Sequence, residues 1–317
     1  MKSARIIAVV GATGLQGGGL VRAILDAPTA GFTVRALTRH PLAERAMALA
    51  ARGVEVVATD LDDAASVERA FAGAYGAFCV TNFWEHFSPD RELRQAAAMA
   101  QAARRTGLQH VLWSTLEDTR RFMPPGDDRM PTLMGRYKVP HFDGKGEANA
   151  AFTERGIPAT FLLTSFYWDN LITFGMGPRR AADGVLELAL PLGDGKLPGI
   201  ASEDIGRCAF ALFEQGPASI GRTVGIAGEH LTGAEMATAL TAMLARPVRY
   251  SDVPLNVYRR LDIQGSEELA NMFQFKREFS DLFRAARDVE RTRRLNPALQ
   301  SFGTWLSRNW TRIPLPS

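Results

Sequence analysis

The stretch IIAVVGATGLQGGGL, residues 6–20, decides how the first half of this chain folds. Its first five residues are an apolar run typical of a strand buried on both faces. Gly11, Gly14 and Gly17 follow at a G-x-x-G-x-x-G spacing. Gly11 allows a sharp turn, Gly14 lets a pyrophosphate approach the backbone, and Gly17 lets the next helix pack closely on the strand. The N-terminus of that helix would offer N–H groups and a positive dipole end to phosphates, so the stretch predicts a dinucleotide-binding loop.

Composition limits the class of protein. With 317 residues and 46% hydrophobic content, the chain can bury a large core in one domain or two lobes. Cys79 and Cys208 stand at no metal-ligand spacing, which is typical of reduced thiols in a cytoplasmic protein. Met1–Arg5 leads straight into the first strand, and no apolar run approaches the ~20 residues of a membrane span, so we expect neither signal peptide nor membrane anchor. A net charge of +3 suits an anionic cofactor but does not indicate nucleic-acid binding.

The first half alternates strand-like and helix-like segments at βαβ spacing. The expected strands are Ile6–Val10, Thr33–Leu37, Val54–Ala58, Ala77–Val80, His110–Ser114 and Ala159–Leu163. The expected helices are Leu42–Arg52, Ala64–Ala72, Asp90–Thr106 and Phe142–Arg155. This order predicts an α/β fold, a Rossmann doubly wound parallel sheet over residues 1–163. Residues 164–317 are expected to form a smaller α-rich C-terminal lobe, with some segments returning to the sheet.

Beyond residue 164 the βαβ rhythm fades. Residues 183–198 resemble a hairpin around Gly193-Asp194-Gly195. The expected helices here are Glu203–Gln215, Thr232–Leu244 with a capping box at Thr232 and Glu235, Glu267–Phe283 and Arg284–Leu295. Glu117–Val139, rich in proline and charge, is expected to be a long loop near the carboxyl ends of the strands, where ligands bind in such sheets.

The residues after the second strand bear on the choice of cofactor. NAD sites usually carry Asp or Glu there, whereas this chain reads Leu37-Thr38-Arg39-His40-Pro41. The planar guanidinium of Arg39 can bind a 2′-phosphate, so NADP(H) is favoured over NAD(H). The alternative is that Arg39 is an ordinary surface residue in a turn.

Other polar residues follow the third and fourth strands. Asp60 follows the third strand and could reach an adenine amino group, while Asp62 is either a second site residue or a helix cap. Thr81-Asn82-Phe83 closes the fourth strand and is expected to face the nicotinamide half of a cofactor. Phe83 and Trp84 either shield that ring or pack in the core.

The chain resembles the NmrA-like family of atypical short-chain dehydrogenases/reductases, and its redox-sensing members in particular. The similarity lies in GATGLQGG at residues 11–18, VTNFWE at 80–85, HFDGKGE at 141–147, YWDNL at 167–171, ELANMF at 268–273 and RLNPALQSFGTWL at 294–306. It therefore spans almost the whole chain.

The resemblance implies a set of NADP(H)-binding residues: Gly11, Ala12, Thr13, Gly14, Leu15 and Gln16 at the pyrophosphate, Arg39 at the 2′-phosphate, Asp60 and Leu61 at the adenine, Thr81, Asn82, Phe83 and Arg94 along the ribose and nicotinamide, Lys145 at the nicotinamide ribose, and Tyr167, Trp168, Asp169 and Asn170 closing the pocket. Leu42 and Ala43 stand where the similar family members have basic residues, which weakens the expected phosphate clamp.

The wider superfamily catalyses reduction with a Ser, a Tyr and a Lys, the last two spaced Y-x-x-x-K on one helix face. Ser114 and Lys145 occupy the Ser and Lys positions, but His141 stands where the Tyr belongs. Imidazole can relay a proton near neutral pH, or His141 is simply the start of a helix. Tyr137 is four residues out of register. The candidate catalytic residues are therefore Lys145, His141 and Ser114, and whether the protein is an enzyme stays open.

Two functions follow. The first is an NADP(H)-binding redox sensor whose conformation and association with a protein partner follow the NADPH/NADP⁺ balance, as the resemblance implies. The second is an NADPH-dependent oxidoreductase acting on a quinone or small aromatic carbonyl, with an aromatic pocket formed by Phe83, Trp84, Phe87, Phe166, Tyr167 and Trp168. A homodimer is compatible with both. No metal site is expected, because His86, His110 and His230 lack partners at ligand spacing, and no recognition-helix motif or large basic patch indicates DNA binding.

Overall fold

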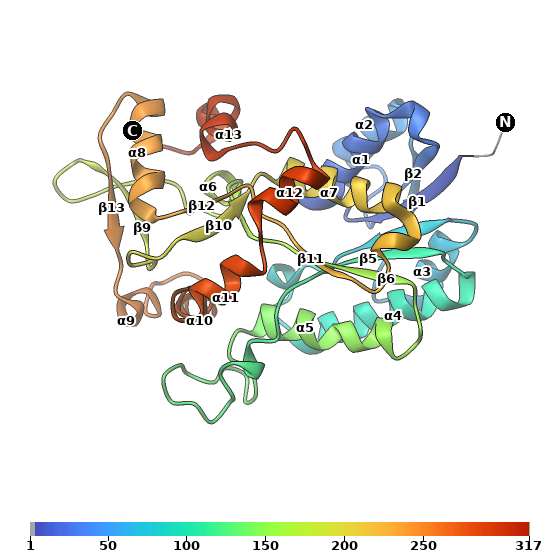
Figure 1. Ribbon diagram of the computed structural model, residues 1–317, viewed down its shortest axis with the longest axis horizontal. Coiled ribbons are helices and arrows are strands. Elements are labelled where there is room, and N and C mark those ends of the chain that lie inside the picture. The colour runs from blue at the N-terminus through green and yellow to red at the C-terminus, as the bar shows by residue number, and fades with distance from the viewer. Residues whose placement is uncertain (1–3, 317) are drawn as a thin grey trace. The chain divides into compact units, whose positions relative to one another are not determined.

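The structure is a computed structural model that describes residues 4–316, and the chain divides into two compact units (Figure 1). The first unit holds the residues up to Asp118, His141–Leu163 and Ile205–Val224. The second holds Thr119–Pro140, Thr164–Asp204 and the residues from Gly225 onward. The long segment before α5 thus groups with the second unit, and residues 205–224 return to the first.

A seven-stranded sheet forms the centre of the first unit, in the order β11-β6-β5-β4-β1-β2-β3. Its strands are β1 (Arg5–Val10), β2 (Phe32–Thr38), β3 (Glu55–Ala58), β4 (Gly76–Cys79), β5 (His110–Thr115), β6 (Ala159–Leu163) and β11 (Thr223–Gly225). The strands from β1 to β6 pair in parallel. This is the predicted doubly wound Rossmann sheet, extended by β11 beside β6.

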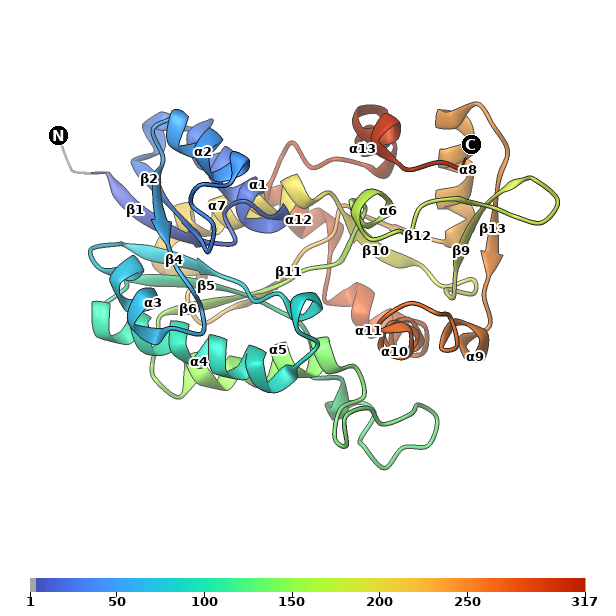
Figure 2. The same ribbon diagram turned by 180° about the vertical axis from the view of Figure 1, so that it is seen from behind.

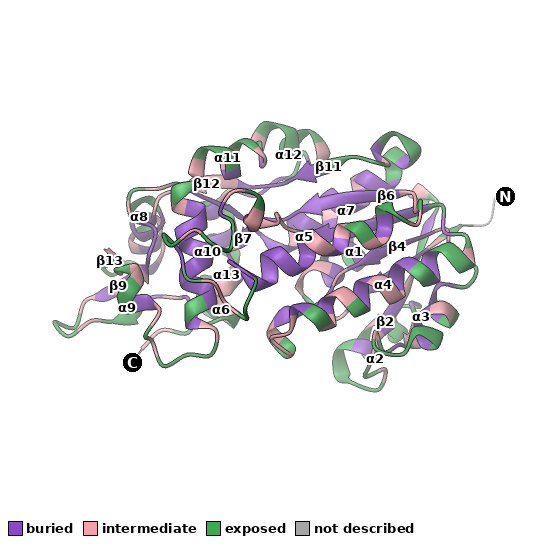
Figure 3. Ribbon diagram, turned by 90° about the horizontal axis from the view of Figure 1, so that it is seen from below, coloured by how far each residue is buried: buried purple, intermediate pink, exposed green. Residues whose placement is uncertain are grey.

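Helices cover both faces of this sheet (Figure 1): α1, α2 and α7 lie on one face, and α3, α4 and α5 on the other. Their bounds are α1 (Leu15–Leu25), α2 (Glu44–Ala51), α3 (Ala64–Phe71), α4 (Pro89–Thr106), α5 (Pro140–Thr153) and α7 (Ser202–Gln215), with short 3₁₀ turns η1 (Pro28–Ala30), η2 (Phe83–Glu85) and η4 (Gly216–Ser219). Because both faces are covered, the strands read as continuous apolar runs, and β4 and β6 are coloured as buried in Figure 3. A Cβ on Gly206 of α7 would lie 2.0 Å from the backbone of Gly19, so glycine is what lets α7 pack against α1.

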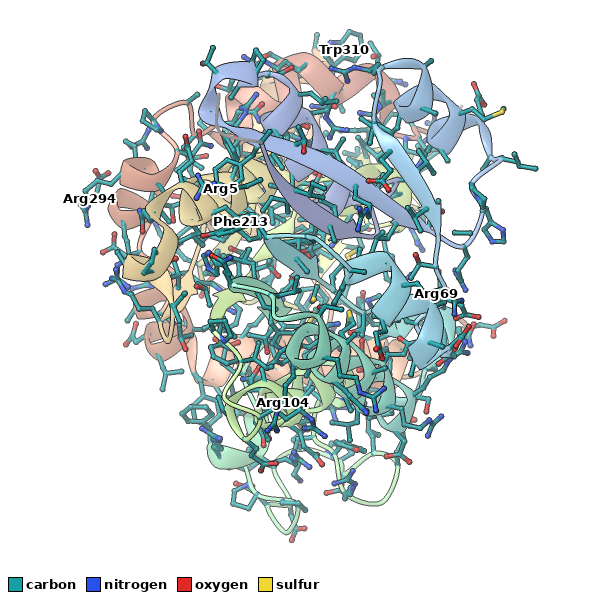
Figure 4. The ribbon with its side chains drawn as sticks, turned by 90° about the vertical axis from the view of Figure 1, so that its right-hand side faces the viewer. Arg5, Arg69, Arg104, Phe213, Arg294 and Trp310 are labelled. Carbon is teal, nitrogen blue, oxygen red and sulfur yellow. The ribbon has the colours of Figure 1, made fainter. Side chains whose placement is uncertain are left out.

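A buried histidine, His110, begins β5 and has both a polar and an aromatic neighbour. His110, at the start of β5, shares a hydrogen bond with the Thr160 hydroxyl at 2.9 Å, and its ring packs against Phe213 of α7, which Figure 4 labels. Burial lowers the pKa of His110 to about 4, so the ring stays neutral at neutral pH. On β4, burial raises the pKa of the Cys79 thiol. Cys79 and Cys208 are both buried, and neither forms a disulfide.

The second unit contains two small sheets, β12-β10-β7 and β13-β9-β8, and several helices (Figure 2). The strands are β7 (Phe166–Tyr167), β8 (Arg179–Arg180), β9 (Leu186–Leu190), β10 (Leu197–Ile200), β12 (Glu229–Leu231) and β13 (Val248–Asp252). The helices are α6 (Asn170–Thr173), α8 (Gly233–Leu244), α9 (Leu255–Tyr258), α10 (Ser266–Glu278), α11 (Ser280–Ala285), α12 (Val289–Leu295) and α13 (Phe302–Asn309), with 3₁₀ turns η3 (Thr119–Arg121) and η5 (Trp310–Arg312). The predicted capping box of α8 is present: Thr232 and Glu235 bond each other's backbone N–H groups.

Two predictions for this unit are wrong. Residues 183–198 do not form a hairpin, because β9 pairs with β8 and β13 whereas β10 pairs with β7 and β12. Strand β9 turns back on β8 instead, and its other edge takes β13, which arrives after α8. The helix predicted over Glu267–Phe283 is interrupted at Phe279, and the one predicted over Arg284–Leu295 starts only at Val289.

Lys138 and two α10 side chains anchor the segment before α5 within the second unit. The Lys138 ammonium donates to the carbonyls of Asp127 and Met130 at 2.6 Å each. The Asn271 amide donates to the carbonyls of Pro131 and Lys138, and Gln274 donates to that of Arg129. The segment predicted as a long loop is thus tied down by side-chain hydrogen bonds to its carbonyls.

Across residues 4–316, no helix is both long enough and apolar enough to span a membrane.

Candidate functional site

The glycine loop lies between β1 and α1, where the sequence predicts it. Gly11 has a φ of 65°, a left-handed conformation that favours glycine, and its carbonyl accepts a hydrogen bond from the Gly14 N–H at 2.9 Å. A Cβ on Gly17 would lie 2.4 Å from the Gly11 carbonyl oxygen, a distance that the fold cannot absorb without moving the backbone. Gly11 and Gly17 therefore each have a structural reason to be glycine.

Within residues 4–316, the N-terminus of α1 has neither a side-chain cap nor a nearby acidic residue in its first turn. Gly14 is its N-cap residue, no side chain among the described residues caps it, and its first turn holds no acidic residue. Most surface helices satisfy their first N–H groups with a Ser, Thr or Asp side chain, as Asp63 does for α3 and Ser88 for α4. An uncapped N-terminus after a glycine turn suits an anionic phosphate.

Arg39 follows β2, as predicted, and is half exposed. Its Nη2 lies 2.8 Å from Oε1 of Glu85, the last residue of η2. A second arginine, Arg45 on α2, points its Nη1 toward the Thr13 carbonyl of the glycine loop at 3.4 Å. Arg45 is therefore a basic group near the loop that the sequence pattern did not indicate, because it lies beyond the apolar Leu42 and Ala43.

The acidic residues after β3 play different parts. The Asp60 carboxylate accepts the N–H of Asp62 at 3.0 Å, which closes a tight turn. Asp62 is not the helix cap, because Asp63 accepts the Ala65 N–H at the start of α3. Asp62 instead binds Arg91 of α4, and this hydrogen bond holds the pKa of Asp62 below its usual range. Leu61 between them packs on the core of the first unit.

Lys145 lies in a buried cluster with Thr81 and Glu92. Its Nζ lies 2.9 Å from the Thr81 carbonyl, 2.6 Å from the Thr81 hydroxyl and 2.8 Å from Oε1 of Glu92. The Thr81 hydroxyl donates to the same carboxylate oxygen at 2.6 Å. Because an ammonium has three N–H groups, all of its donors have acceptors within this cluster. The Lys145 side chain is 11% exposed and that of Glu92 is fully buried, so the two charges compensate each other out of water.

The second oxygen of Glu92, Oε2, is buried and has no hydrogen-bond partner among the described residues. A buried acceptor of this kind is costly and normally finds a donor. The sequence alone does not indicate Glu92, because a Glu on the first turn of a long helix usually serves only the helix dipole.

Ser114 and the residues after it align α5 and α1 with β5. The Ser114 hydroxyl donates to Oε1 of Gln16 at 2.7 Å, which ties the end of β5 to the first turn of α1. The Thr115 hydroxyl lies 3.0 Å from the Lys145 carbonyl and 2.8 Å from the Asn149 side-chain oxygen. These bonds fix the position of α5 along the sheet, and with it the position of Lys145.

His141 is buried among aromatic side chains. Its ring lies 4.9 Å from that of Trp84, 5.9 Å from that of Phe83 and 4.7 Å from that of Phe142, between centroids. Phe83 is buried as well and also packs edge-on against Phe87. These contacts make the Phe83–Phe87 region an aromatic cluster around the position where the superfamily has its Tyr. Asn82 and Arg94 are exposed.

Four of the predicted site residues belong to the second unit: Tyr167, Trp168, Asp169 and Asn170. Trp168 is buried and packs against Phe302 and Trp305. The Asp169 carboxylate accepts the Ser202 N–H at the start of α7 at 2.9 Å. The Tyr167 hydroxyl lies 3.2 Å from that of Thr164, and burial raises the pKa of Tyr167 to about 12.

Tyr137, the tyrosine nearest the superfamily position, also lies in the second unit. Its ring is covered by the guanidinium groups of Arg120 and Arg136, at 5.1 and 4.5 Å from its centroid. Such contacts hold the ring through cation–π attraction.

Two further features of the described residues bear on the predictions. No group of three or more His, Cys, Asp and Glu side chains within residues 4–316 could hold a metal ion. A hollow of about 520 Å³ lies at the C-terminal end of α4, lined by Gln101, Arg104, Arg105 and Arg155. Figure 4 labels Arg104, and Arg105 is paired with Glu68 of α3. None of these four residues belongs to the predicted site.

The sheet order and the glycine loop define a Rossmann-fold protein of the kind that binds nucleotides at the carboxyl ends of its strands. The chain belongs to the NmrA-like family, whose profile matches residues 3–298. This confirms the resemblance that the sequence motifs carry.

The relatives of known name include reductases and a regulator. An NAD(P)H azoreductase of Xenophilus azovorans is 31% identical over 79% of this chain and 78% of its own length. An NmrA-like family domain-containing oxidoreductase of Aspergillus hancockii, hkm9, is 29% identical over 84% of this chain and 79% of its own. The nitrogen metabolite repression protein nmr of Neurospora crassa is 27% identical over 66% of this chain and 42% of its own.

Solved structures share the fold. NmrA, a negative transcriptional regulator, in complex with NADP superposes with a TM-score of 0.77 at 24% identity, covering 98% of this chain and 95% of that chain. Triphenylmethane reductase of Citrobacter sp. complexed with NADP(H) gives 0.74 at 19% identity, covering 96% and 99%. The predicted fold class is confirmed by this likeness.

Proposed function

We propose that this protein binds NADP(H) at the carboxyl ends of β1, β2 and β4. The observation that carries the proposal is the N-terminus of α1, which follows a glycine turn and has no side-chain cap among the described residues. Its first N–H groups can therefore bind a pyrophosphate. Arg39 stands at the end of β2 where an NAD-specific site would carry an acid, and it would bind the 2′-phosphate.

The test is a binding titration with NADP⁺, NADPH, NAD⁺ and NADH. We expect NADPH and NADP⁺ to bind, and Arg39→Ala to weaken both by about 10- to 150-fold, because a charge-assisted hydrogen bond to phosphate contributes on the order of 1.5–3 kcal/mol. The affinity for NAD(H), which lacks the 2′-phosphate, should change little. Arg52→Ala, which removes an exposed arginine just after α2, is the matched control. Equal affinity of wild type and Arg39→Ala for NADP(H) would refute the assignment of Arg39.

For the role of the bound cofactor, we propose an NADPH-dependent oxidoreductase that reduces a quinone or another small aromatic acceptor. The support is the 31% identity to an NAD(P)H azoreductase, together with the aromatic cluster around His141. The bound cofactor would supply the hydride. The chain's own residues would hold the ribose, exclude water with the Phe83 and Trp84 rings, and deliver a proton from His141.

The second candidate role is the redox sensor, and the Thr81–Lys145–Glu92 cluster favours it. In a Ser-Tyr-Lys reductase the lysine cation lowers the pKa of the proton donor. Here a carboxylate bonds that cation and compensates its charge, so a neighbouring donor receives little activation. A site of this kind would bind the cofactor well and turn over slowly, as a protein that reports cofactor occupancy to a partner requires.

An NADPH-oxidation assay with quinones, azo dyes and aromatic aldehydes separates the two roles. Turnover that falls at least tenfold in His141→Phe, with NADPH affinity retained, supports the reductase, since phenylalanine keeps the ring packing and removes only the proton carrier. Tight binding without turnover supports the sensor. The control is Phe142→Leu, which alters a neighbouring ring that carries no proton.

A further inference from the structure

The partner of Arg39 is unusual for a residue expected to bind phosphate. Its Nη2 donates to Oε1 of Glu85 at 2.8 Å, and both side chains are about half exposed, at 47% and 44%. The two residues lie 46 positions apart in the chain, and each stands directly after or at the end of an element that the sheet positions: β2 for Arg39 and the turn η2 after β4 for Glu85. The pair is therefore built by the fold.

Two arginines lie near Glu85: Arg39 and Arg91 of α4. Arg91 is already bound by Asp62, whose hydrogen bond is the main reason that the pKa of Arg91 is raised, and Glu85 is a smaller cause of that shift. Among the described residues, Glu85 is thus the one carboxylate hydrogen-bonded to Arg39.

A 2′-phosphate bound at Arg39 would meet this carboxylate. Both groups are acceptors and both are negative, so they cannot share the guanidinium without repulsion. We propose that Glu85 competes with the 2′-phosphate for Arg39, and that it thereby sets how strongly the protein prefers NADP(H) to NAD(H). The inference rests on the proposed NADP(H) site and concerns its selectivity.

The rival interpretation is that Glu85 holds Arg39 in the orientation that phosphate binding needs. The two interpretations predict effects of opposite sign. If Glu85 competes, its removal tightens the binding of NADP(H). If Glu85 orients Arg39, its removal weakens that binding. Because the pair is exposed on both sides, breaking it should barely change folding, and the effect should appear in binding.

The decisive variant is Glu85→Gln, which keeps the shape of the side chain and removes its charge. We expect NADP⁺ and NADPH to bind about three- to tenfold more tightly, the range that removing one half-exposed charge near a phosphate would give. NAD⁺ and NADH should bind within about twofold of wild type, since they lack the competing group. The gain should shrink as salt is raised, because exposed charges are screened.

Two controls separate this inference from a general charge effect. Glu154→Gln removes an exposed carboxylate of the same unit just after α5, and should leave all four affinities unchanged. In an Arg39→Ala background, Glu85→Gln should no longer improve NADP(H) binding, because the group for which it competes is gone. The fragment 2′,5′-ADP should show the same gain as NADP⁺, since the effect lies at the adenosine end.

Unchanged or weaker NADP(H) binding in Glu85→Gln would overturn the inference, and so would a gain of equal size for NAD(H). These outcomes are distinct from failure of the cofactor assignment. If Arg39→Ala weakens NADP(H) and Glu85→Gln does not tighten it, only the role of Glu85 is wrong. If wild type binds none of the four nucleotides, both the site and the role are wrong.

Discussion

The two ends of the candidate site in the first unit are built on opposite principles. At the glycine loop, the backbone between β1 and α1 presents an uncapped helix end and no acidic side chain in its first turn. At Lys145, the ammonium on α5 donates three hydrogen bonds: to the Thr81 carbonyl, to the Thr81 hydroxyl and to Oε1 of Glu92 on α4. The first end is prepared for a ligand, whereas at the second every donor of the Lys145 ammonium is already bound, and only Oε2 of Glu92 lacks a hydrogen-bond partner among the described residues.

This difference separates binding from catalysis. An open helix end gains free energy when a phosphate arrives, because its N–H groups and dipole find a partner. The Lys145 ammonium can donate to a new ligand only by giving up one of its present hydrogen bonds, and breaking a bond of a buried ion pair costs more free energy than breaking one at a surface. We therefore expect the cofactor's phosphates to dominate affinity, and the lysine cluster to limit reactivity.

The largest effect on stability is expected in the Lys145 cluster. Glu92→Gln leaves the Lys145 ammonium buried without a counter-charge, and should lower the free energy of unfolding by about 3 kcal/mol. Urea unfolding measures this. The control is Glu68→Gln, which breaks an exposed pair with Arg105 and should cost less than about 1 kcal/mol.

Adding Lys145→Met to Glu92→Gln should recover part of the loss, because the isolated charge is removed. Equal small losses for Glu92→Gln and Glu68→Gln would show that the lysine cluster is not the compensated pair described here.

The next effect is a loss of NADPH affinity when the glycine loop is changed. Gly17→Ala places a Cβ 2.4 Å from the Gly11 carbonyl oxygen, and should weaken NADPH binding about 100-fold, or about 2.7 kcal/mol. Gly18→Ala is the matched control, because its Cβ would meet the flexible end of Arg22 at 3.3 Å and should cost little. Binding titrations after a check of the circular dichroism decide the matter. Similar affinities for the two variants would mean that the steric demand at Gly17 does not shape the phosphate site.

The smallest effect tests the link between the two ends. Ser114→Ala removes the hydrogen bond to Gln16 and should lower the free energy of unfolding by about 1 kcal/mol, with little change in NADPH affinity. Ser88→Ala, which removes the cap of α4, should cost a similar amount.

Turnover distinguishes these two serine variants. If any acceptor is reduced, a larger fall for Ser114→Ala than for Ser88→Ala would show that Ser114 touches the substrate. Equal turnover would confine Ser114 to aligning β5 with α1.

The sequence predicted strands β1 to β5 of the Rossmann sheet well because each is followed by a turn and a helix, whereas the three-residue β11 was not predicted. The six strands from β1 to β6 lie within one residue of their predicted bounds, and β6 matches at both ends. The second unit was harder to predict. Its strands β7 and β8 are two residues long, and β9 pairs in parallel with β13, about 60 residues later. Local patterns favoured a hairpin, while long-range pairing decided the result.

The candidate site divides in the same way. Gly11, Gly14, Gly17 and Arg39 could be proposed from the sequence because the glycines lie at the junction of β1 and α1 and Arg39 directly follows β2. Glu85 and Glu92 could not, since each acts through a residue far away in the sequence: Arg39 in one case, and Lys145 in the other. The signal that could have found Glu92 is the burial of an acid on the sheet-facing side of α4, which only packing shows.

The buried Cys79 on β4 has a practical consequence for following the molecule in time. A thiol whose pKa is raised by burial remains protonated, and only the thiolate reacts quickly with disulfides, maleimides or peroxide. Cys208, the other cysteine, is also buried in the first unit. The native protein should therefore react slowly with such reagents. The rate of thiol labelling would then report the opening of the Rossmann core, with no reporter group engineered into it.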